Sequence, residues 1–316
     1  MKKTTFAIVG TGIVGERIIN QLQKNDCVEI IAVFDENKQR LSEIANKYGL
    51  TVASSYDEVL SLKPNWVYIG TPPVSHASLS KRAIAENLNV LCEKPLAHDA
   101  FDGETMAKAA EESGVITAMH FPLMYSPPVR HFMEMIEKGA IGDIVRVELN
   151  TYFPHWPRLW QQNPWIGSRE QGGFTREVFP HYLQLMYRMF GRVTLTEHNT
   201  VYPNDSALAE TSVLAIGKTE KQIPVLLNGL TGVGQLEELS YIVYGTEGVL
   251  KLHNWAELSM AQKDRPFEIL TSFDSVKTLV EECIVASQDE TAFLVPFSEG
   301  LEIQRLIDQL LAVQNL

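Results

Sequence analysis

The chain contains little cysteine and lacks any arrangement of residues that is typical of a metal site. Only Cys27, Cys92 and Cys283 occur among its 316 residues. A small, odd number of cysteines argues against a disulfide framework and favours a reducing, cytoplasmic location. No group of His, Cys and Asp residues has the spacing of metal ligands, so the sequence predicts no metal cofactor.

Basic charge and long apolar runs are also scarce. The chain has 27 Lys and Arg residues against 39 Asp and Glu residues, which gives a formal net charge of −12. Nucleic acids and anionic membranes bind to basic surfaces, so we expect neither as a partner. No apolar run approaches the roughly 18 residues that a transmembrane helix requires.

The first sixty residues, in contrast, place a glycine pattern between a predicted strand and a predicted helix. An apolar strand leads into Gly10, Gly12 and Gly15, and a helical pattern begins at Ile13. Gly10 permits a tight turn, Gly12 lets a pyrophosphate approach the backbone, and Gly15 lets the helix pack closely on the strand. The helix N-terminus, at Ile13 and Val14, presents N–H groups to phosphates. These residues predict a dinucleotide-binding site.

The end of the next strand bears on the choice of cofactor. This apolar strand ends on Asp35, twenty residues after Gly15, where a carboxylate accepts hydrogen bonds from both ribose hydroxyls of an adenosine. Asp35 and Glu36 would repel a 2′-phosphate, whereas Lys38 or Arg40 would bind one. Because the two acids come first, the sequence favours NAD, with NADP as the alternative.

The start of the chain superficially imitates a secretory signal peptide. Met1-Lys2-Lys3 precedes an apolar stretch, but the glycines that interrupt this stretch belong to the nucleotide-binding turn. No cleavage-like end precedes Glu16 and Arg17. We therefore reject a signal peptide and expect a cytoplasmic protein.

Strand and helix patterns predict an α/β chain of two domains. In the first, at 1–121, strands alternate with helices, which predicts a Rossmann domain with a doubly wound parallel sheet. In the second, at 122–316, alternating segments follow one another without helices between them, which predicts a large, mostly antiparallel open sheet with helices on one face. The predicted strands lie at 4–9, 28–34, 66–70, 88–92, 115–119, 143–153, 193–202, 208–217, 223–232, 237–246 and 249–262. The predicted helices lie at 13–24, 37–48, 76–87, 99–113, 128–138, 174–190, 275–288 and 298–314.

Five motifs extend over nearly the whole chain. They are Gly10 to Gly15, Gly70-Thr71-Pro72-Pro73-Val74-Ser75-His76, Glu93-Lys94-Pro95, Gly172-Gly173 with Glu177 and His181, and Tyr244-Gly245-Thr246-Glu247-Gly248. With them the sequence resembles the Gfo/Idh/MocA oxidoreductases, which include glucose-fructose oxidoreductase and inositol dehydrogenase. The resemblance implies an NAD(P)-dependent dehydrogenase or reductase that acts on CH–OH groups.

Lys94 is the candidate catalytic residue of the first domain. It follows an apolar strand and precedes Pro95, which holds it out of the helical region of backbone conformation. Most strand-end lysines are merely solvated, but the carboxyl edge of a parallel sheet is where ligands bind. The resemblance implies that Lys94 hydrogen-bonds the substrate hydroxyl or carbonyl and helps to move its proton. It also implies cofactor contacts for Thr71, Pro72, His76, Glu93 and Lys94.

Glu177 and His181 are the candidate catalytic pair of the second domain. They are four residues apart in the predicted helix at 174–190, which places both side chains on one face. They form either a surface pair or an acid that orients the substrate beside an imidazole that acts as general base. The resemblance implies the second role, although the family usually has Asp at the place of Glu177 and a further acid at the place of Gln184.

Two neighbouring residues are candidates for substrate binding, and one family contact is missing. An arginine suits carboxylate or vicinal hydroxyl groups and a tryptophan face suits a sugar ring, so Arg176 and Trp165 are predicted substrate contacts. The family usually has an Asn and an Arg just after Phe121, and this chain has neither. A contact to the nicotinamide is therefore missing or comes from elsewhere, for example from His120.

The leading interpretation is an NAD(P)-dependent oxidoreductase that transfers a hydride between nicotinamide and a secondary alcohol or ketone. The substrate would be a small molecule, namely a sugar, a polyol or a related cyclic hydroxyl compound. Two alternatives stay open: an NAD-dependent glycosidase with an internal redox cycle, and a non-catalytic dinucleotide-sensing regulator. Lys94 and His181 argue against the regulator, which needs no proton relay. The resemblance further implies a homodimer or homotetramer that assembles through the C-terminal sheet.

Overall fold

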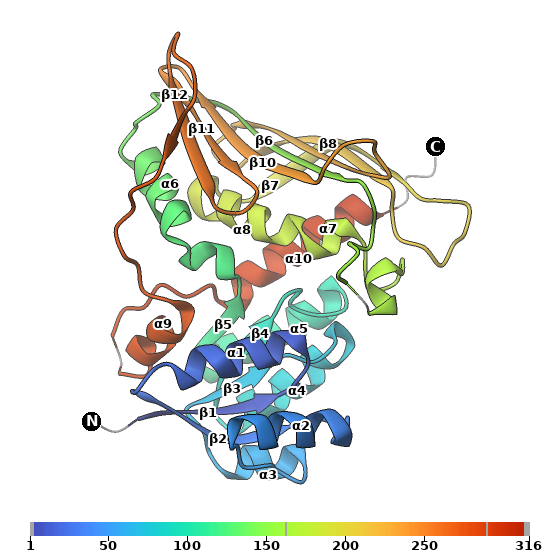
Figure 1. Cartoon of the computed structure of the whole chain (residues 1–316), viewed down its shortest axis with the longest axis vertical. Helices are drawn as coiled ribbons and strands as arrows, with labels where there is room; N and C mark the ends of the chain where they lie inside the picture. The colour runs from blue at the N-terminus through green and yellow to red at the C-terminus, as the bar shows by residue number, and fades with distance from the viewer. Residues whose placement is uncertain (1–2, 162, 289, 313–316) are drawn as a thin grey trace. The chain divides into compact units, whose positions relative to one another are not determined.

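The computed structural model describes residues 3–161, 163–288 and 290–312, and the chain divides into two compact units (Figure 1). Unit 1 comprises the chain up to Phe121 together with 277–304, and unit 2 comprises 122–276 and the chain from Arg305 onward. The sequence predicts one domain at 1–121 and a second at 122–316. The second domain was predicted to run uninterrupted to the end of the chain, whereas residues 277–304 belong to unit 1.

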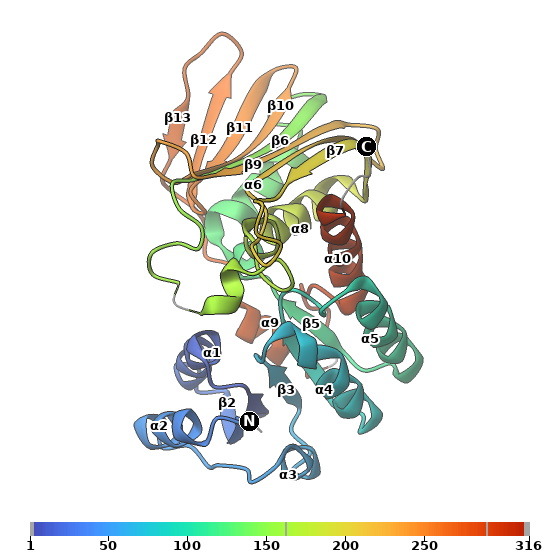
Figure 2. The same ribbon diagram turned by 90° about the vertical axis from the view of Figure 1, so that its right-hand side faces the viewer.

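Unit 1 contains a parallel five-stranded sheet, sheet A, in the order β2-β1-β3-β4-β5. Its strands are apolar on both faces because helices cover both: Phe6, Ile8, Val67 and Leu91 are fully buried. Figure 2 shows α1 on one side of these strands and α4 and α5 on the other. This confirms the predicted doubly wound Rossmann fold. The strands are β1 (Thr4–Val9), β2 (Val28–Phe34), β3 (Trp66–Ile69), β4 (Asn89–Glu93) and β5 (Thr117–His120).

The helices of unit 1 begin and end near their predicted positions. Asp99 caps α5, because its side chain accepts a hydrogen bond from the N–H of Asp102. One short helix, α3, was not predicted. The helices are α1 (Ile13–Gln23), α2 (Lys38–Tyr48), α3 (Tyr56–Ser61), α4 (Pro73–Ala85), α5 (Ala100–Ser113) and α9 (Leu279–Ala286).

The strand order of sheet A creates a topological switch point between β1 and β3. From β1 the chain moves to β2 on one side, and from β3 it moves through β4 to β5 on the other. Ligands of open α/β sheets bind outside the carboxyl ends of the strands at such a point. Gly10 follows β1 and Gly70 follows β3, so both lie at this edge.

Unit 2 contains sheet B, which has eight strands in the order β13-β12-β11-β10-β6-β9-β8-β7. Only the β6–β9 pair is parallel, so the predicted large, mostly antiparallel sheet is confirmed. The strands are β6 (Ile144–Phe153), β7 (Val193–Val201), β8 (Ser212–Thr219), β9 (Pro224–Thr231), β10 (Glu238–Gly245), β11 (Gly248–His253), β12 (Glu257–Gln262) and β13 (Glu268–Leu270). β13 was not predicted.

Helices cover one face of sheet B (Figure 1). Along β8 the buried residues Val213 and Ala215 alternate with Leu214 and Ile216, which are 50% and 45% exposed. The second face of the sheet is therefore partly apolar and uncovered. The helices are η1 (Pro122–Tyr125), α6 (Pro127–Glu137), η2 (Pro164–Gly167), α7 (Phe174–Glu177) and α8 (Phe179–Phe190), and α10 (Phe297–Leu311) begins in unit 1 and ends in unit 2.

Two predicted segments of unit 2 are interrupted in the structure. The strand predicted at 249–262 is two strands, β11 and β12, joined by a turn in which Asn254 and Trp255 have φ of 43° and 74°. The helix predicted at 174–190 is broken at Val178 into α7 and α8. Pro180 explains this break, because it lacks an N–H group and its ring obstructs the carbonyl four residues earlier.

Two classes of feature are absent from the residues that the structure describes. None of the helices there combines the length and the apolarity that crossing a membrane would demand. Within the same ranges, no three His, Cys, Asp or Glu side chains come together as a metal ion would require.

Candidate functional site

The glycine turn after β1 has room for a ligand at one position and none at the other two. A Cβ atom on Gly10 would lie 2.6 Å from the carbonyl carbon of Gly70, and Gly10 has a φ of +94°. A Cβ on Gly15 would lie 2.1 Å from the carbonyl oxygen of Gly10. A Cβ on Gly12 would meet no atom within 4 Å. Gly10 and Gly15 are therefore required for packing, whereas Gly12 borders open space.

The N-terminus of α1 opens onto this space. Gly12 is the N-cap residue, and no side chain accepts a cap hydrogen bond there. Ile13 and Val14, the first two residues of the helix, are 58% and 38% exposed despite being apolar. N–H groups at a helix N-terminus suit a phosphate, both as donors and through the helix dipole. The turn therefore fits a pyrophosphate.

Asp35 is held rigidly at the end of β2. Its Oδ2 accepts hydrogen bonds from the N–H of Thr11 at 2.6 Å and from the Thr11 hydroxyl at 2.9 Å, and its Oδ1 accepts from the N–H of Asn37 at 2.8 Å. A carboxylate has about four acceptor positions, so one is left for a ligand hydroxyl, and not two as the sequence predicts. Its placement beside the glycine turn fits the ribose of an adenosine. Together, Gly12, the α1 N-terminus and Asp35 fit a bound dinucleotide.

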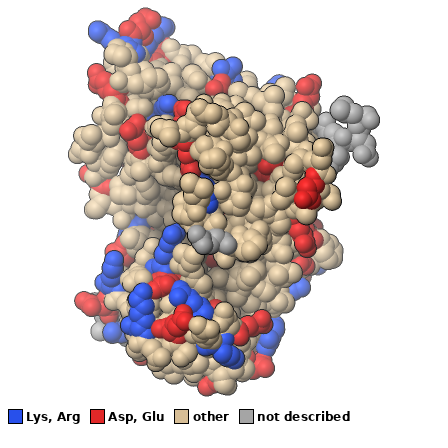
Figure 3. Space-filling view, turned by 45° about the vertical axis from the view of Figure 1, so that its right-hand side comes forward, with Lys and Arg blue, Asp and Glu red and all other residues tan. Residues whose placement is uncertain are grey.

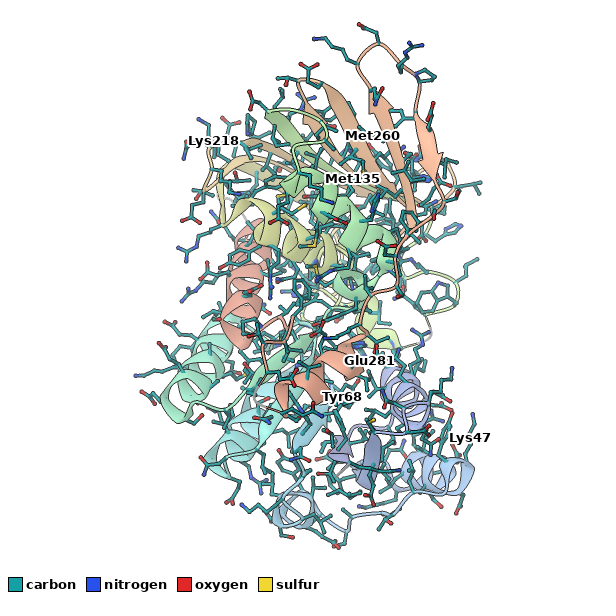
Figure 4. All side chains as sticks on the ribbon, turned by 90° about the vertical axis from the view of Figure 1, so that its left-hand side faces the viewer. Lys47, Tyr68, Met135, Lys218, Met260 and Glu281 are labelled. Carbon is teal, nitrogen blue, oxygen red and sulfur yellow. The ribbon has the colours of Figure 1, made fainter. Side chains whose placement is uncertain are left out.

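Glu93 is the centre of a buried polar cluster beside Lys94. It is 9% exposed, and its Oε1 accepts a hydrogen bond from the Tyr68 hydroxyl at 2.7 Å and pairs with Nδ1 of His120. Figure 4 labels Tyr68 on β3. Burial alone would raise the pKa of Glu93, but His120, Tyr68 and Lys94 hold it below its usual range. One ring nitrogen of His120 is thus paired with Glu93. The peptide bond between Lys94 and Pro95 is cis.

His76 connects two of the predicted cofactor loops. Its ring is fully buried, with Nδ1 at 3.0 Å from the carbonyl oxygen of Pro95 and Nε2 at 2.8 Å from that of Thr71. Carbonyl oxygens only accept, so a neutral ring donates to one of the two. Burial lowers the pKa of His76 and favours this neutral form. Pro72 precedes α4 as its N-cap. The histidine therefore holds the Thr71 loop against the turn that carries Lys94.

In unit 2, Glu177 and His181 lie on different helices. Glu177 is the last residue of α7, and His181 lies in the first turn of α8, where its N–H donates to the carbonyl of Val178. The argument from spacing on a single helix is therefore wrong, for the reason given above for Pro180. His181 is 8% exposed, whereas Glu177 is partly exposed.

Trp255 was missed by the sequence reasoning. Its ring lies edge-on to the ring of His181 with centroids 5.3 Å apart, and it stacks on Tyr182, also at 5.3 Å. A tryptophan with positive φ is a rare and strained conformation. The only signal in the sequence is Asn254-Trp255 at the middle of a long alternating segment, where a turn had to be recognised first.

Glu210 explains the second glycine of the Gly172-Gly173 motif, whereas a Cβ on Gly172 would lie 2.2 Å from the carbonyl oxygen of Ile166. The Glu210 carboxyl is 1% exposed, its Oε1 accepts a hydrogen bond from the N–H of Thr175 at 2.8 Å, and burial raises its pKa. A Cβ on Gly173 would lie 2.2 Å from Oε2 of Glu210. Glu210, in the connection between β7 and β8, therefore holds the start of α7, and only glycine at 173 leaves room for it.

Comparison with known proteins identifies the chain. Residues 4–121 match the family model of oxidoreductases with an NAD-binding Rossmann fold, and residues 129–251 match the model of the Gfo/Idh/MocA C-terminal domain. The chain belongs to the Gfo/Idh/MocA family. Unit 1 of this family member is accordingly an NAD-binding Rossmann domain, in agreement with the glycine turn and Asp35.

Its relatives are diverse. An uncharacterised oxidoreductase of Streptococcus pneumoniae is 29% identical over 63% of this chain and 55% of its own length. A 2,7-anhydro-N-acetylneuraminate hydratase of Mediterraneibacter gnavus is 25% identical over 80% of this chain and 68% of its own. A glucose-6-phosphate 3-dehydrogenase of Bacillus subtilis is 21% identical over 98% and 95%. The first two curated relatives are matched over only 55% and 62% of their length.

Solved structures share the fold of this family member. A levoglucosan dehydrogenase in complex with NADH and L-sorbose superposes with a TM-score of 0.83 at 15% identity, covering 98% of this chain and 96% of the other. An oxidoreductase from Agrobacterium radiobacter in complex with NAD+, L-tartaric acid and magnesium has a TM-score of 0.83 at 16% identity, covering 97% and 95%.

The two predicted substrate contacts lie in unit 2 close to the Gly172-Gly173 motif. The Arg176 guanidinium donates to the carbonyl of Arg169 at 3.1 Å and to that of Gly172 at 3.4 Å. Trp165 is a partly exposed residue of η2. One guanidinium nitrogen of Arg176 thus holds the loop before α7.

A cavity of about 930 Å³ in unit 1 contains none of the predicted site residues. It lies where α5 ends and β5 begins, at the amino edge of sheet A, and Gly114, Ile116 and Phe297 are among its lining residues. Because dinucleotides bind at the carboxyl edge of such a sheet, this cavity is not the cofactor site.

Proposed function

We propose that this protein is an NAD-dependent dehydrogenase that acts on a secondary alcohol of a sugar, a polyol or a related cyclic hydroxyl compound. The observation that carries the proposal is the arrangement at the carboxyl edge of sheet A. The open space at Gly12 follows β1, the braced carboxylate of Asp35 follows β2, and Lys94 follows β4. A dinucleotide site and a lysine thus occur at the ligand-binding edge of one sheet.

Lys94 is the proposed proton-handling group of unit 1. NAD, when bound, supplies the hydride acceptor for oxidation of the alcohol carbon. The ammonium group of Lys94 would hydrogen-bond the reacting oxygen and stabilise negative charge as its proton leaves. The buried Glu93 carboxylate next to it, whose pKa is held low by His120, Tyr68 and Lys94, keeps a negative charge at that strand end.

Unit 2 contributes the proposed general base and substrate contacts. His181 would accept the hydroxyl proton, Glu177 would orient the imidazole or the substrate, and Arg176 and Trp165 would contact the substrate. The indole of Trp255 against His181 supports this role, because it restricts the orientation of the imidazole ring.

The names of relatives support the substrate class. One relative over nearly the whole chain is named a glucose-6-phosphate 3-dehydrogenase, which acts on a sugar hydroxyl. A relative over 80% of the chain is named a 2,7-anhydro-N-acetylneuraminate hydratase, and this favours a second candidate, an enzyme that oxidises and re-reduces its own substrate. Such an enzyme would release no net NADH.

One experiment tests both candidates. The purified protein is incubated with NAD and a panel of polyols, sugars and anhydro-sugars, while NADH absorbance and substrate conversion are followed together. We expect one NADH for each molecule converted. Conversion without NADH would support the internal redox cycle, and neither NADH nor conversion with any compound would contradict both.

We also propose that the protein is cytoplasmic and assembles as a homodimer or homotetramer through sheet B. Leu214 and Ile216 leave apolar surface on the uncovered face, and the cysteines are free. Light scattering after gel filtration should give a dimer or tetramer, and Leu214→Glu with Ile216→Glu should reduce it to monomer. An unmodified protein that is monomeric at micromolar concentration would refute the assembly.

A further inference from the structure

Glu16 is the centre of an ion-pair cluster beside the glycine turn. It is the residue after Gly15, in the first turn of α1, and its Oε2 lies 2.5 Å from a guanidinium nitrogen of Arg40. Its Oε1 accepts hydrogen bonds from Nζ of Lys47 at 2.7 Å and from the Tyr48 hydroxyl at 2.9 Å. Figure 4 labels Lys47, which lies on α2. One carboxylate thus engages two cations from the helix that follows Asp35.

Arg40 also lies next to the acid that is placed to bind the adenosine ribose. Its Nε donates to the carbonyl oxygen of Thr11 at 3.0 Å, while the N–H and hydroxyl of Thr11 donate to Asp35. Arg40 and Asp35 therefore hold the same residue of the turn from two sides. An arginine at such a place is what accommodates the 2′-phosphate of NADP in dinucleotide-binding domains.

The second basic residue that the sequence put forward for a 2′-phosphate is engaged elsewhere. Nζ of Lys38 lies 5.1 Å from the centroid of the Phe34 ring, in a cation–π contact. Arg40 is therefore the cation whose orientation decides whether a phosphate on the ribose is bound.

We propose that Glu16 makes unit 1 prefer NAD over NADP, because it holds Arg40 in an internal ion pair. The inference rests on the proposed function, since it requires unit 1 to bind a dinucleotide. To reach a 2′-phosphate, Arg40 would have to leave Glu16, whose carboxylate would then repel the phosphate. The Asp35 carboxylate repels a 2′-phosphate by its charge. Glu16 keeps Arg40, the cation that would offset this repulsion, in an ion pair away from the phosphate.

The charge of Glu16 is present at any working pH. Hydrogen bonds from Lys47, Arg40 and Tyr48 lower the pKa of Glu16 to about 2. The Glu16 side chain is 21% exposed and that of Arg40 is 30% exposed, so the pair is partly shielded from solvent. Salt screens partly buried pairs less than exposed ones, so the restraint on Arg40 persists at physiological ionic strength.

Glu16→Gln tests the proposal by calorimetric titration with NAD+ and NADP+. The amide keeps nearly the same shape but releases the guanidinium, which can then donate two charge-assisted hydrogen bonds to the phosphate. We expect the ratio of the NADP Kd to the NAD Kd to fall about tenfold, the size of one such bond. Adding Arg40→Gln to this variant should return the ratio to the wild-type value.

Glu43→Gln is the matched control. The change removes one negative charge, as Glu16→Gln does. Glu43 also pairs with Arg40, but its Oε2 lies 3.8 Å from the nearest guanidinium nitrogen and its side chain is 54% exposed. We expect it to change the ratio less than twofold. An unchanged ratio in Glu16→Gln, or an equal fall in Glu43→Gln, would overturn the proposal.

Arg40→Gln alone provides a test that does not depend on the folding of the Glu16 variant. Because the wild-type Arg40 is withheld from the phosphate, this change removes no phosphate contact; it only leaves Glu16 without its partner, so any rise in the ratio of NADP Kd to NAD Kd should stay well below tenfold. A rise of about tenfold or more would show that Arg40 already binds the phosphate and would overturn the proposal. Wild-type protein that binds neither dinucleotide would instead overturn the proposed function.

Discussion

Replacing His120 with leucine should destabilise the protein to an extent that depends on pH. In the wild type, the imidazole pairs with Glu93, and the two side chains are 9% and 11% exposed. Leucine fills part of the space but offers no hydrogen bond. The carboxylate would keep the Tyr68 hydroxyl as a donor and the nearby charge of Lys94. Glu93 would thus become a buried charge without its largest compensating partner.

The size of the loss follows from the burial of the pair. Removing one partner of a buried pair typically costs about 3–5 kcal/mol, because the other charge stays buried. Tyr68 and Lys94 remain, so we expect the lower end, about 3 kcal/mol at pH 8. For a domain of this size that corresponds to a fall in Tm of roughly 6–12 °C.

The pH dependence has a defined sign. In the wild type the pKa of Glu93 is lowered, so its ionised form stabilises the fold above the ordinary carboxyl pKa, and this stability is lost as the pH falls through the lowered value. Without His120, burial acts in the opposite direction and raises the pKa, so ionisation opposes folding. The difference in unfolding free energy between the two proteins should therefore increase from acid to neutral pH.

Urea unfolding followed by circular dichroism between pH 4 and pH 8 measures this difference. The matched control is Glu93→Gln combined with His120→Leu, which removes the charge and keeps a partner for Tyr68, and which should be more stable at pH 8 than His120→Leu alone. A loss below about 1 kcal/mol at pH 8, the value of an ordinary neutral hydrogen bond, would refute the reasoning, as would a loss that is the same at every pH.

Three further predictions concern the proposed reaction. Lys94→Met should reduce the rate of NADH formation by about 10²–10⁴ while leaving the NAD Kd, measured by calorimetry, within a few-fold of wild type, and near-normal turnover would exclude Lys94 from catalysis. Asp35→Ala should weaken NAD binding and favour NADP relative to NAD, whereas an unchanged Kd for both would remove Asp35 from the cofactor site. His181→Asn should abolish the rise of the oxidation rate with pH near ~6–8. Glu177→Gln should shift that rise to lower pH, because a carboxylate stabilises imidazolium and its loss lowers the apparent pKa of the base. An unchanged pH profile in His181→Asn would assign the base to another group.

Other charged side chains pair on the exposed surface of the protein. Figure 3 shows basic side chains next to acidic ones on the face in view. The exposed ion pairs of unit 1 include Lys63 with Glu86 and Arg82 with Asp57. Exposed pairs of this kind contribute little to stability. The partly shielded cluster around Glu16 is different, because it lies beside the glycine turn.

Local sequence patterns were sufficient to predict the features that depend on neighbouring residues. The period of two in β6 and β8 and the strand-turn-helix pattern around Gly10 and Gly15 follow from residues close together in the chain. The order of these elements then implied a doubly wound sheet and a second, antiparallel one. The break at Val178 could also have been predicted from Pro180. The apolar residues at helical spacing on both sides of it favoured one continuous helix instead.

Contacts between distant residues were decided only by the tertiary structure. His120 joins Glu93 across adjacent strands, Trp255 reaches His181 from a turn 74 residues later, and Glu210 holds the N–H of Thr175. No periodicity encodes such pairs, because each depends on strand register and helix packing that the whole chain sets together. The same holds for Glu16, whose carboxylate looks like any first-turn helix acid in the sequence. The sequence by itself determined which chemical groups are present and that those of unit 1 lie at the carboxyl edge of sheet A. The tertiary structure decided which of these groups contact one another.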